Sequence, residues 1–120
     1  MPQSSSSIVD LLQAGIRAEG YRQQAIASNI ANLETPGYRR TDVKFEDLLA
    51  EALKTEGDVD LDEIEPEPFH PGNTPVKSNG NDVSLDMEVG ELLKNSLRHT
   101  AYVRLLNRKF QQIDQAINIR

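Results

Sequence analysis

Few residues of this chain have the spacing of catalytic or metal-binding groups. Asp58, Asp60 and Asp62 alternate like the first ligands of a calcium-binding loop. The sixth position of such a loop requires glycine and is Glu63, and the twelfth requires glutamate and is Phe69. We therefore interpret the three aspartates as part of a solvated acidic segment, and we expect no metal and no cofactor.

The remaining candidates for chemistry are also isolated. His70 and His99 lie in different segments and form no His-Glu-x-x-His pattern, so we interpret His99 as a core or interface imidazole. The chain has no cysteine, no Gly-x-Ser-x-Gly motif and no phosphate-binding glycine loop. The carboxylates gather in the segment that is least able to hold them rigidly, whereas catalysis needs preorganised groups. The sequence predicts that the chain is not an enzyme.

Two asparagines and a turn end the first apolar segment. Asn29 and Asn32 are spaced to share one side of a helix, where asparagine is a poor interior residue. The run Thr35-Pro36-Gly37-Tyr38 ends the helix, because proline lacks an N–H and Pro-Gly suits a type II turn. Two interpretations stay open: solvated amides at a helix end, or amides that bind backbone or a neighbouring chain.

Composition limits the class of protein. A chain of 120 residues holds one domain at most, and its 38 % of apolar residues without tryptophan offer a thin core. The net charge of −6 lies in residues 55–82, which carry eight acidic groups and one basic group. No strongly basic face exists, so we expect no nucleic acid as partner. Residues 1–7 form a polar N-terminus, expected to be flexible, without the features of a cleaved signal peptide, and no stretch suits membrane insertion.

Apolar spacing predicts a mainly α fold. Two long terminal helices, over 8–33 and 85–118, should form a coiled-coil-like pair, since 85–118 keeps an unbroken four–three spacing. Residues 44–53 should form a short amphipathic segment, completing an N-terminal unit over 8–54 ahead of the C-terminal unit 83–120. Residues 55–82 form an acidic, proline-rich linker with too little apolar surface to order itself, so the middle should be irregular and partly disordered. Short extended pieces are expected at Val59, Leu61 and Val76.

The two helices have more apolar surface than one pairing can cover. The first helix has an apolar seam, interrupted by Glu19 and Arg22, and beside it a seam of small residues. Pairing would leave the small-residue seam and the flank Leu93, Leu97 and Leu105 uncovered, and exposed stripes of this kind mark interaction surfaces. We predict a subunit that packs against other subunits. The expected interface residues are Ile8, Leu12, Ile26, Asn29, Ile30, Asn32, Leu33, Val89, Leu92, Leu93, Val103, Leu106, Phe110, Ile113 and Ile117.

The chain resembles a known family. The run Ala27-Ser28-Asn29-Ile30-Ala31-Asn32-x-x-Thr35-Pro36-Gly37-Tyr38-Arg39 is similar to the N-terminal signature of the bacterial flagellar rod and hook proteins. The stretches 81–88, 92–102 and 105–110 look most like the proximal-rod member of that family, and the resemblance covers 8–54 and 80–118. Leu33-Glu34 departs from the small or polar residues that the family more often has there.

The resemblance implies a structural subunit of the basal-body rod, located in the periplasm. It would polymerise through its terminal helices into a torque-transmitting shaft for motility. Its partners would be further copies, other rod proteins and the adaptor between the membrane ring and the rod. The flagellar type III apparatus would export it without a cleaved signal, and Phe45-x-x-x-Leu49 looks like the export-gate motif of early substrates. The alternative for Phe45 and Leu49 is simply one helix face.

Coupling of folding to assembly is a further expectation, because the termini should be only marginally stable alone. The isolated chain should therefore show much less helix than its two long segments would give. Two other functions remain open: a soluble helical adaptor or chaperone-like binding module, and another short rod protein of the same family.

Overall fold

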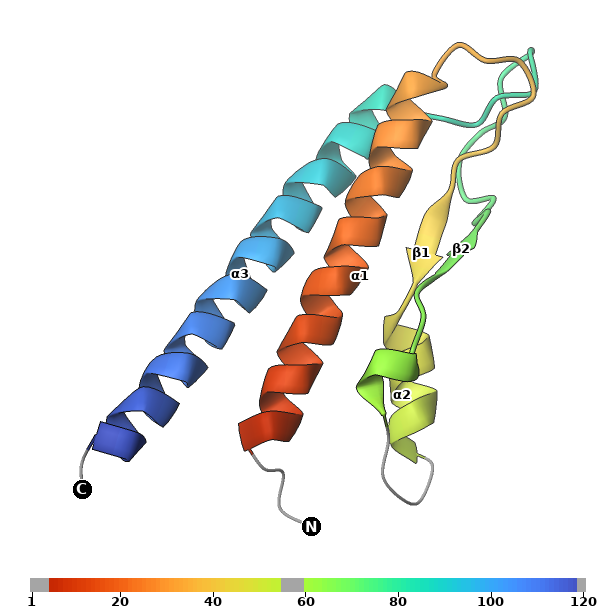
Figure 1. The fold of residues 1–120 in the computed structure, drawn as a ribbon. Coiled ribbons are helices and arrows are strands. Elements are labelled where there is room, and N and C mark those ends of the chain that lie inside the picture. Colours follow the sequence, from red (N-terminus) through yellow and green to blue (C-terminus); the bar gives the residue numbers. More distant parts are fainter. Residues whose placement is uncertain (1–4, 55–59, 119–120) are drawn as a thin grey trace.

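The computed structural model describes residues 5–54 and 60–118, apart from the side chains of 5–7 and 62. Two long helices, α1 (Ser5–Ala31) and α3 (Leu85–Asn118), run side by side in opposite directions (Figure 1). The predicted mainly α fold with a pair of terminal helices is confirmed. The subunit is elongated, at 67 × 30 × 16 Å, because α3 alone forms a rod of about 50 Å at a rise of 1.5 Å per residue.

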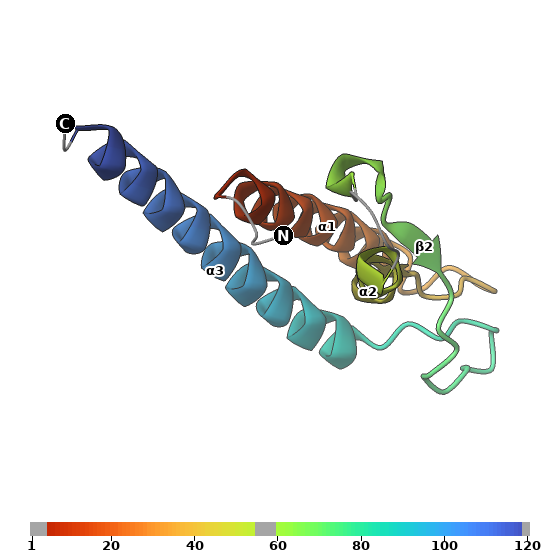
Figure 2. The same ribbon diagram turned by 90° about the horizontal axis from the view of Figure 1, so that it is seen from below.

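The middle of the chain lies along α1, on the side away from α3 (Figures 1 and 2). It contains a strand β1 (Asp42–Lys44), a helix α2 (Glu46–Lys54), a single 3-10 turn η1 (Leu61–Glu63) and a strand β2 (Glu67–Phe69). The two strands pair antiparallel, with Val43 opposite Pro68. Helix α2 confirms the amphipathic segment that was predicted at 44–53.

Residues 60–82 depart from the expected irregular linker, because α1 provides hydrogen-bond donors and apolar surface that the segment itself lacks. The Arg17 guanidinium donates from Nη2 to the carbonyl oxygens of Leu61 and Ile64, at 3.1 and 3.4 Å. Leu61 lies in η1 rather than in an extended piece, and Val76 is exposed outside any strand. The expectations for Val59 and Asp58 lie outside the described residues.

The apolar core sits between α1 and α2. Ala14, Ala18 and Phe45 are buried together, and Leu49, Leu61 and Ile64 pack around them. The small-residue seam of α1 is therefore covered in this region, where we had expected it to stay open. The physical reason is that two alanines leave room on α1 for the Phe45 ring, which would otherwise remain exposed.

Helix α3 faces α1 through a row that is mostly polar. Glu88 and Asn95 are buried, and Tyr102, seven residues further on, packs on Gly15 of α1. A Cβ built at Gly15 would lie 2.6 Å from the Tyr102 ring, so glycine is what permits this close approach. The predicted apolar seam of α3 lies beside this row, and Val89, on that seam, is 54 % exposed. The pairing is therefore coiled-coil-like in spacing but does not use the apolar register that we expected.

The two loops at one end of the helix pair meet at glycines. Gly37 and Gly80 have positive φ angles of 75° and 85°, which favour glycine. Gly37 N–H donates to the Asn79 carbonyl oxygen at 2.9 Å, and a Cβ at Gly80 would lie 3.3 Å from the Gly37 Cα. The turn that ends α1 therefore also packs against the loop that precedes α3, through Gly37 and Gly80.

Candidate assembly interface

Asn29 is the centre of a buried polar cluster that joins the end of α1 to the start of α3. Its side chain is fully buried, and Nδ2 donates to the Thr41 carbonyl oxygen at 2.9 Å and to Glu88 Oε2 at 3.1 Å. Its Oδ1 accepts from the Thr41 N–H at 2.9 Å and from the Tyr38 hydroxyl at 3.1 Å. One amide therefore holds the turn, the segment before β1 and the first turn of α3.

Arg40 completes the cluster from the other side. Its Nε donates to Glu88 Oε1 at 2.7 Å, and both side chains are buried. Its backbone N–H donates to Asp82 Oδ1 at 2.5 Å, and its carbonyl oxygen lies 3.1 Å from His70 Nδ1. A buried ion pair with one partner removed leaves an uncompensated charge, which costs about 3–5 kcal/mol. The position of Arg40 relative to α3 is therefore strongly constrained.

Asn81 fastens the loop before α3 onto the end of α1. Its Nδ2 donates to the carbonyl oxygens of Asn32 and Thr35, at 2.9 and 2.8 Å, and its Oδ1 accepts from the Val83 N–H at 2.7 Å. Both carbonyl oxygens belong to the turn that follows α1, so Asn81 fixes this turn from a distant part of the sequence. The Asn32 side chain bonds only locally, to the Ser28 carbonyl oxygen and the Thr35 hydroxyl.

A second buried cluster fixes the middle of the helix pair. Glu19 is buried and accepts from Arg98 Nε of α3 at 2.5 Å and from Arg22 Nη1 at 2.7 Å. Asn95 Nδ2 donates to the Glu19 carbonyl oxygen at 2.7 Å. Arg22 also pairs with Glu46 of α2, so one arginine links three elements. Glu19 and Arg22, which interrupt the apolar seam in the sequence, are therefore structural residues of the interface between helices.

Three groups around this cluster have shifted pKa values. Burial favours loss of the proton from Arg22, but its hydrogen bonds to Glu46 and Glu19 outweigh this and raise its pKa. Burial alone would raise the pKa of Glu46, whereas the hydrogen bond from Arg22 lowers it below the ordinary value. Burial, and then the negative charge of Glu19, raise the pKa of the Tyr102 hydroxyl. All of these carboxylates and cations belong to a structural network, which is a common cause of such shifts.

The outer side of α3 is exposed and apolar. A row of leucine and valine side chains, four residues apart, runs along it and is 46 to 64 % exposed. We name this set the α3 apolar row; it consists of Leu85, Val89, Leu93, Leu97 and Leu105. The flank that we expected to stay uncovered, Leu93, Leu97 and Leu105, is confirmed as exposed. Phe110 and Ile117 are also exposed, at 46 and 64 %.

The other predicted interface residues divide into two groups. Leu12, Ile26 and Asn29 are buried within the subunit, so their side chains are not offered to a neighbour in this conformation. The partly buried group keeps some surface: Ile8, Ile30, Asn32, Leu33, Leu92, Val103, Leu106 and Ile113. Of the two open interpretations of the asparagines, the structure shows that both amides bind backbone of their own subunit.

The remaining candidates have structural surroundings. Phe45 is 2 % exposed in the core and Leu49 packs against this core, so both have a structural role, and the export motif stays a prediction. His99 is exposed, so it is not a core imidazole of this subunit, and its interpretation as an interface imidazole stays a prediction. Within residues 5–54 and 60–118, no group of three or more His, Asp and Glu side chains could hold a metal ion. No helix in the same ranges has the length and apolar character of a membrane span.

Sequence reasoning missed three buried polar residues at the junction of α1 and α3. Glu88, Arg40 and Asn81 were not singled out as site residues, although 81–88 carried part of the family resemblance. A signal was available for Glu88 alone, because it is a polar residue on a helix face that is buried. Glu88 and Asn95, seven residues apart, occupy one face of α3 and could have been recognised as a polar seam.

Comparison with known proteins identifies the class first. A family model described as "Flagella basal body rod protein" matches residues 14–39, which include Asn29 and the turn after it. The second half of α1 and the turn after it are thus similar to those of flagellar basal-body rod proteins, a structural class.

Similarity over the whole chain then identifies the family. The chain is 35 % identical to the flagellar basal body rod protein FlgB of Bacillus subtilis over 118 residues, which cover 91 % of each chain. It is 29 % identical to FlgB of Aeromonas hydrophila over 88 % of each chain, and 26 % identical to FlgB of Borrelia hermsii over 91 % of this chain. The chain belongs to the FlgB family of flagellar basal-body rod proteins.

Proposed function

We propose that this chain polymerises as a rod subunit through the α3 apolar row, which packs against neighbouring subunits of the rod. The observation that carries the proposal is the exposure of five large apolar side chains along one helix, at 46 to 64 % each. Burying a leucine side chain contributes about 1.5–3 kcal/mol, so a subunit gains by covering this row. Isolated apolar side chains on a surface are ordinary, but a continuous row of them marks an interaction site.

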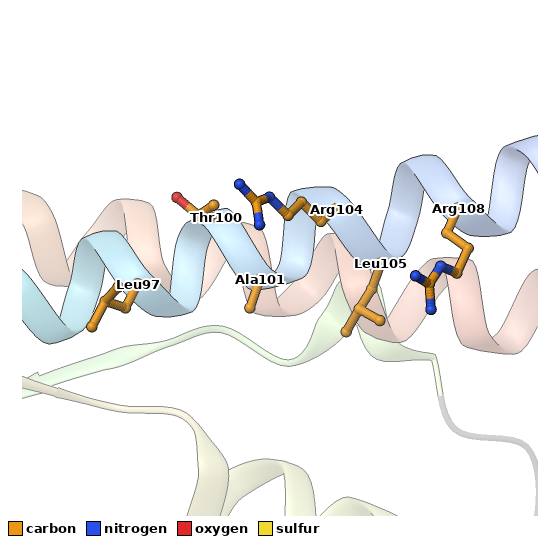
Figure 3. A pocket seen from close by; sticks show the side chains of 6 residues that line it. All are labelled: Leu97, Thr100, Ala101, Arg104, Leu105 and Arg108. Carbon is orange, nitrogen blue, oxygen red and sulfur yellow. The ribbon is translucent and has the colours of Figure 1, made fainter.

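The spacing of the row favours helix-on-helix packing as the mode of assembly. Residues four apart form the ridges that interdigitate when two helices cross at about −50°. Figure 3 shows Leu97, Ala101 and Leu105 pointing to the same side of α3. Further copies of this chain and other rod proteins, whose terminal helices would be of the same kind, are the partners that this surface suits.

Torque transmission follows from the same arrangement. The buried Glu88–Arg40 pair and the Glu19–Arg98 pair hold α3 in one position relative to α1 at two levels. A helix pair that is fixed at two levels resists twisting more than one that is held by apolar packing alone, because each pair has a fixed hydrogen-bond geometry. Many such pairs, packed in parallel, would make a stiff shaft.

The test compares two leucines of similar exposure. Leu97→Asp places a charge in the row on α3, whereas Leu53→Asp places the same charge on α2, where the leucine is 55 % exposed. We expect both variants to keep the wild-type far-ultraviolet circular dichroism. Only Leu97→Asp should be absent from purified basal bodies and fail to restore motility to a deletion strain. Normal incorporation of Leu97→Asp into basal bodies would contradict the proposed role of the α3 apolar row.

We also propose that the chain crosses the flagellar export apparatus before it folds, with Phe45 and Leu49 as the recognised pair. Phe45 is 2 % exposed in the folded subunit, so the motif is accessible only in an unfolded chain. Phe45→Ala removes the motif and a core side chain together. Val43→Ala is the matched control, because Val43 is 7 % exposed and lies outside the motif. Retention of Phe45→Ala in the cytoplasm with export of Val43→Ala supports the proposal, and equal export of both contradicts it.

A further inference from the structure

A groove on the outer side of α3 combines apolar and basic groups. It has a volume of about 510 Å³ and is lined by Leu97, Thr100, Ala101, Arg104, Leu105 and Arg108. Figure 3 shows the Arg104 guanidinium above α3, near Thr100, and the Arg108 guanidinium beside Leu105, whereas Leu97, Ala101 and Leu105 point downward. We name this surface the α3 groove. Its chemistry suits a segment that carries carboxylates beside an apolar surface.

Across the part of the chain that the structure describes, neither arginine of the α3 groove is paired with a carboxylate. The ion pairs of Glu19, Asp42, Glu46, Asp82, Glu88 and Glu91 use other basic residues than Arg104 and Arg108. Residues 99–120 contain four basic residues and one acidic residue, in a chain of net charge −6. The α3 groove is therefore a local positive surface on a negative subunit.

The matching surface is present on the same chain. Glu63, Glu65 and Glu67 are exposed, whereas Pro66 between the last two is buried, so the carboxylates project outward from the segment that joins η1 to β2. We name these three residues the acidic ridge. Arg17 of α1 holds the ridge in place through the carbonyl oxygens of Leu61 and Ile64.

The spacings of the two charged surfaces agree. Arg104 and Arg108 are one helical step of four residues apart, or about 6 Å along α3. Glu65 and Glu67 are two residues apart in an extended segment, or about 6.6 Å. Two guanidinium groups can thus meet two carboxylates at once, and exposed Pro68 can cover the leucines beside them. Paired contacts of this kind give a fixed register as well as attraction.

We propose that the α3 groove of one subunit binds the acidic ridge of a second copy of this chain. Within one subunit α1 separates α3 from the ridge (Figure 1), so the two surfaces cannot meet intramolecularly. A contact between different surfaces of identical subunits is head-to-tail, and it generates rings or helical filaments instead of closed pairs. The contact rests on the proposed function, because it requires copies of this chain to be neighbours in the rod. It covers Leu97 and Leu105 at one end of the α3 apolar row and leaves Leu85, Val89 and Leu93 for the helices of other neighbouring subunits.

Disulfide cross-linking can test this contact directly, because the chain contains no cysteine. Pro68→Cys lies beside the acidic ridge, and Ala101→Cys lies within the α3 groove. Both substitutions leave every charge in place. Cells that produce both variants should give a cross-linked dimer of this chain in basal bodies after mild oxidation. Asn107→Cys, exposed on another side of α3, is the matched control for Ala101→Cys and should give at least tenfold less dimer with Pro68→Cys.

Charge reversal then tests the chemistry. Arg104→Glu with Arg108→Glu in the Ala101→Cys subunit should reduce the dimer at least tenfold, and Glu65→Arg with Glu67→Arg in the Pro68→Cys subunit should restore it. Motile cells without the dimer, or a dimer that is unaffected by charge reversal, would overturn the proposed contact. This failure is distinct from failure of the proposed function. The proposed function would fail if Leu97→Asp subunits were incorporated normally into basal bodies.

Discussion

Replacement of Asn29 by leucine gives the sharpest test of the buried polar cluster. Leucine has a similar size, but it removes all four hydrogen bonds of the amide: two to the Thr41 backbone, one to Glu88 and one to Tyr38. The Glu88 carboxylate keeps its pair with Arg40 and loses one buried donor. We therefore expect Asn29→Leu to lower the stability of the subunit.

The magnitude follows from the groups that are left behind. A buried acceptor without its donor costs about 1–3 kcal/mol, and each of the other lost bonds contributes about 0.5–1.5 kcal/mol. Leucine recovers about 0.4 kcal/mol through its higher helix propensity. The net loss is about 2–7 kcal/mol, and even the lower end of this range lowers the melting temperature of a domain of this size by about 10 °C.

Thermal unfolding followed by circular dichroism at 222 nm measures this loss. Asn107→Leu is the matched control, because Asn107 is exposed on α3, and it should change stability by less than about 0.5 kcal/mol. A melting temperature for Asn29→Leu within 2–3 °C of the control, well inside the shift of about 10 °C derived above, would refute the reasoning. The amides at the end of α1 would then be replaceable, and the cluster would not be what holds α1 to α3.

Three further predictions concern the helix pair. Gly15→Ala should destabilise the subunit by about 1 kcal/mol, since a Cβ would lie 2.6 Å from the Tyr102 ring. In a Tyr102→Leu background the same substitution should be neutral or stabilising. If Gly15→Ala lowers the free energy of unfolding equally in both backgrounds, the contact is contradicted. The pKa of Glu46 is lowered in the folded state, so its pair with Arg22 stabilises the subunit above the unfolded pKa near 4.5 and is lost as the pH falls below it; Glu46→Gln should flatten the fall in melting temperature between about pH 5 and 3. In the isolated chain, amide hydrogens of 106–118 should exchange with solvent much faster than those of 88–98, because Glu88 and Asn95 are buried whereas Phe110 and Ile117 are exposed; equal protection along α3 would contradict the expected coupling of folding and assembly.

The sequence predicted the helices well because their signals are local. The four–three spacing over 85–118 and the stop at Thr35-Pro36-Gly37-Tyr38 depend on residues close together in the chain, and α3 has the predicted bounds. The exposed flank Leu93, Leu97 and Leu105 followed from the same periodicity.

The partners of the polar residues could not be obtained in this way. Asn29 and Glu88 are 59 residues apart, and Arg40 and Glu88 are 48 apart, so no periodicity relates them. The order of residues 60–82 likewise depends on Arg17, whose role appears only when α1 lies beside η1. An apolar pattern also gives the wrong register when a helix interface is built from buried ion pairs such as Glu19 with Arg98.

The most direct test of the account is the position of α3 in the assembled rod. An electron cryomicroscopy map of basal bodies that resolves side chains should show Leu93 and Leu97 of this chain buried against neighbouring subunits. The same map should show Asn29, Arg40 and Glu88 in contact within one subunit, as they are here. The account would be contradicted if Leu93 and Leu97 face solvent in the rod while Asn29 contacts a neighbouring chain.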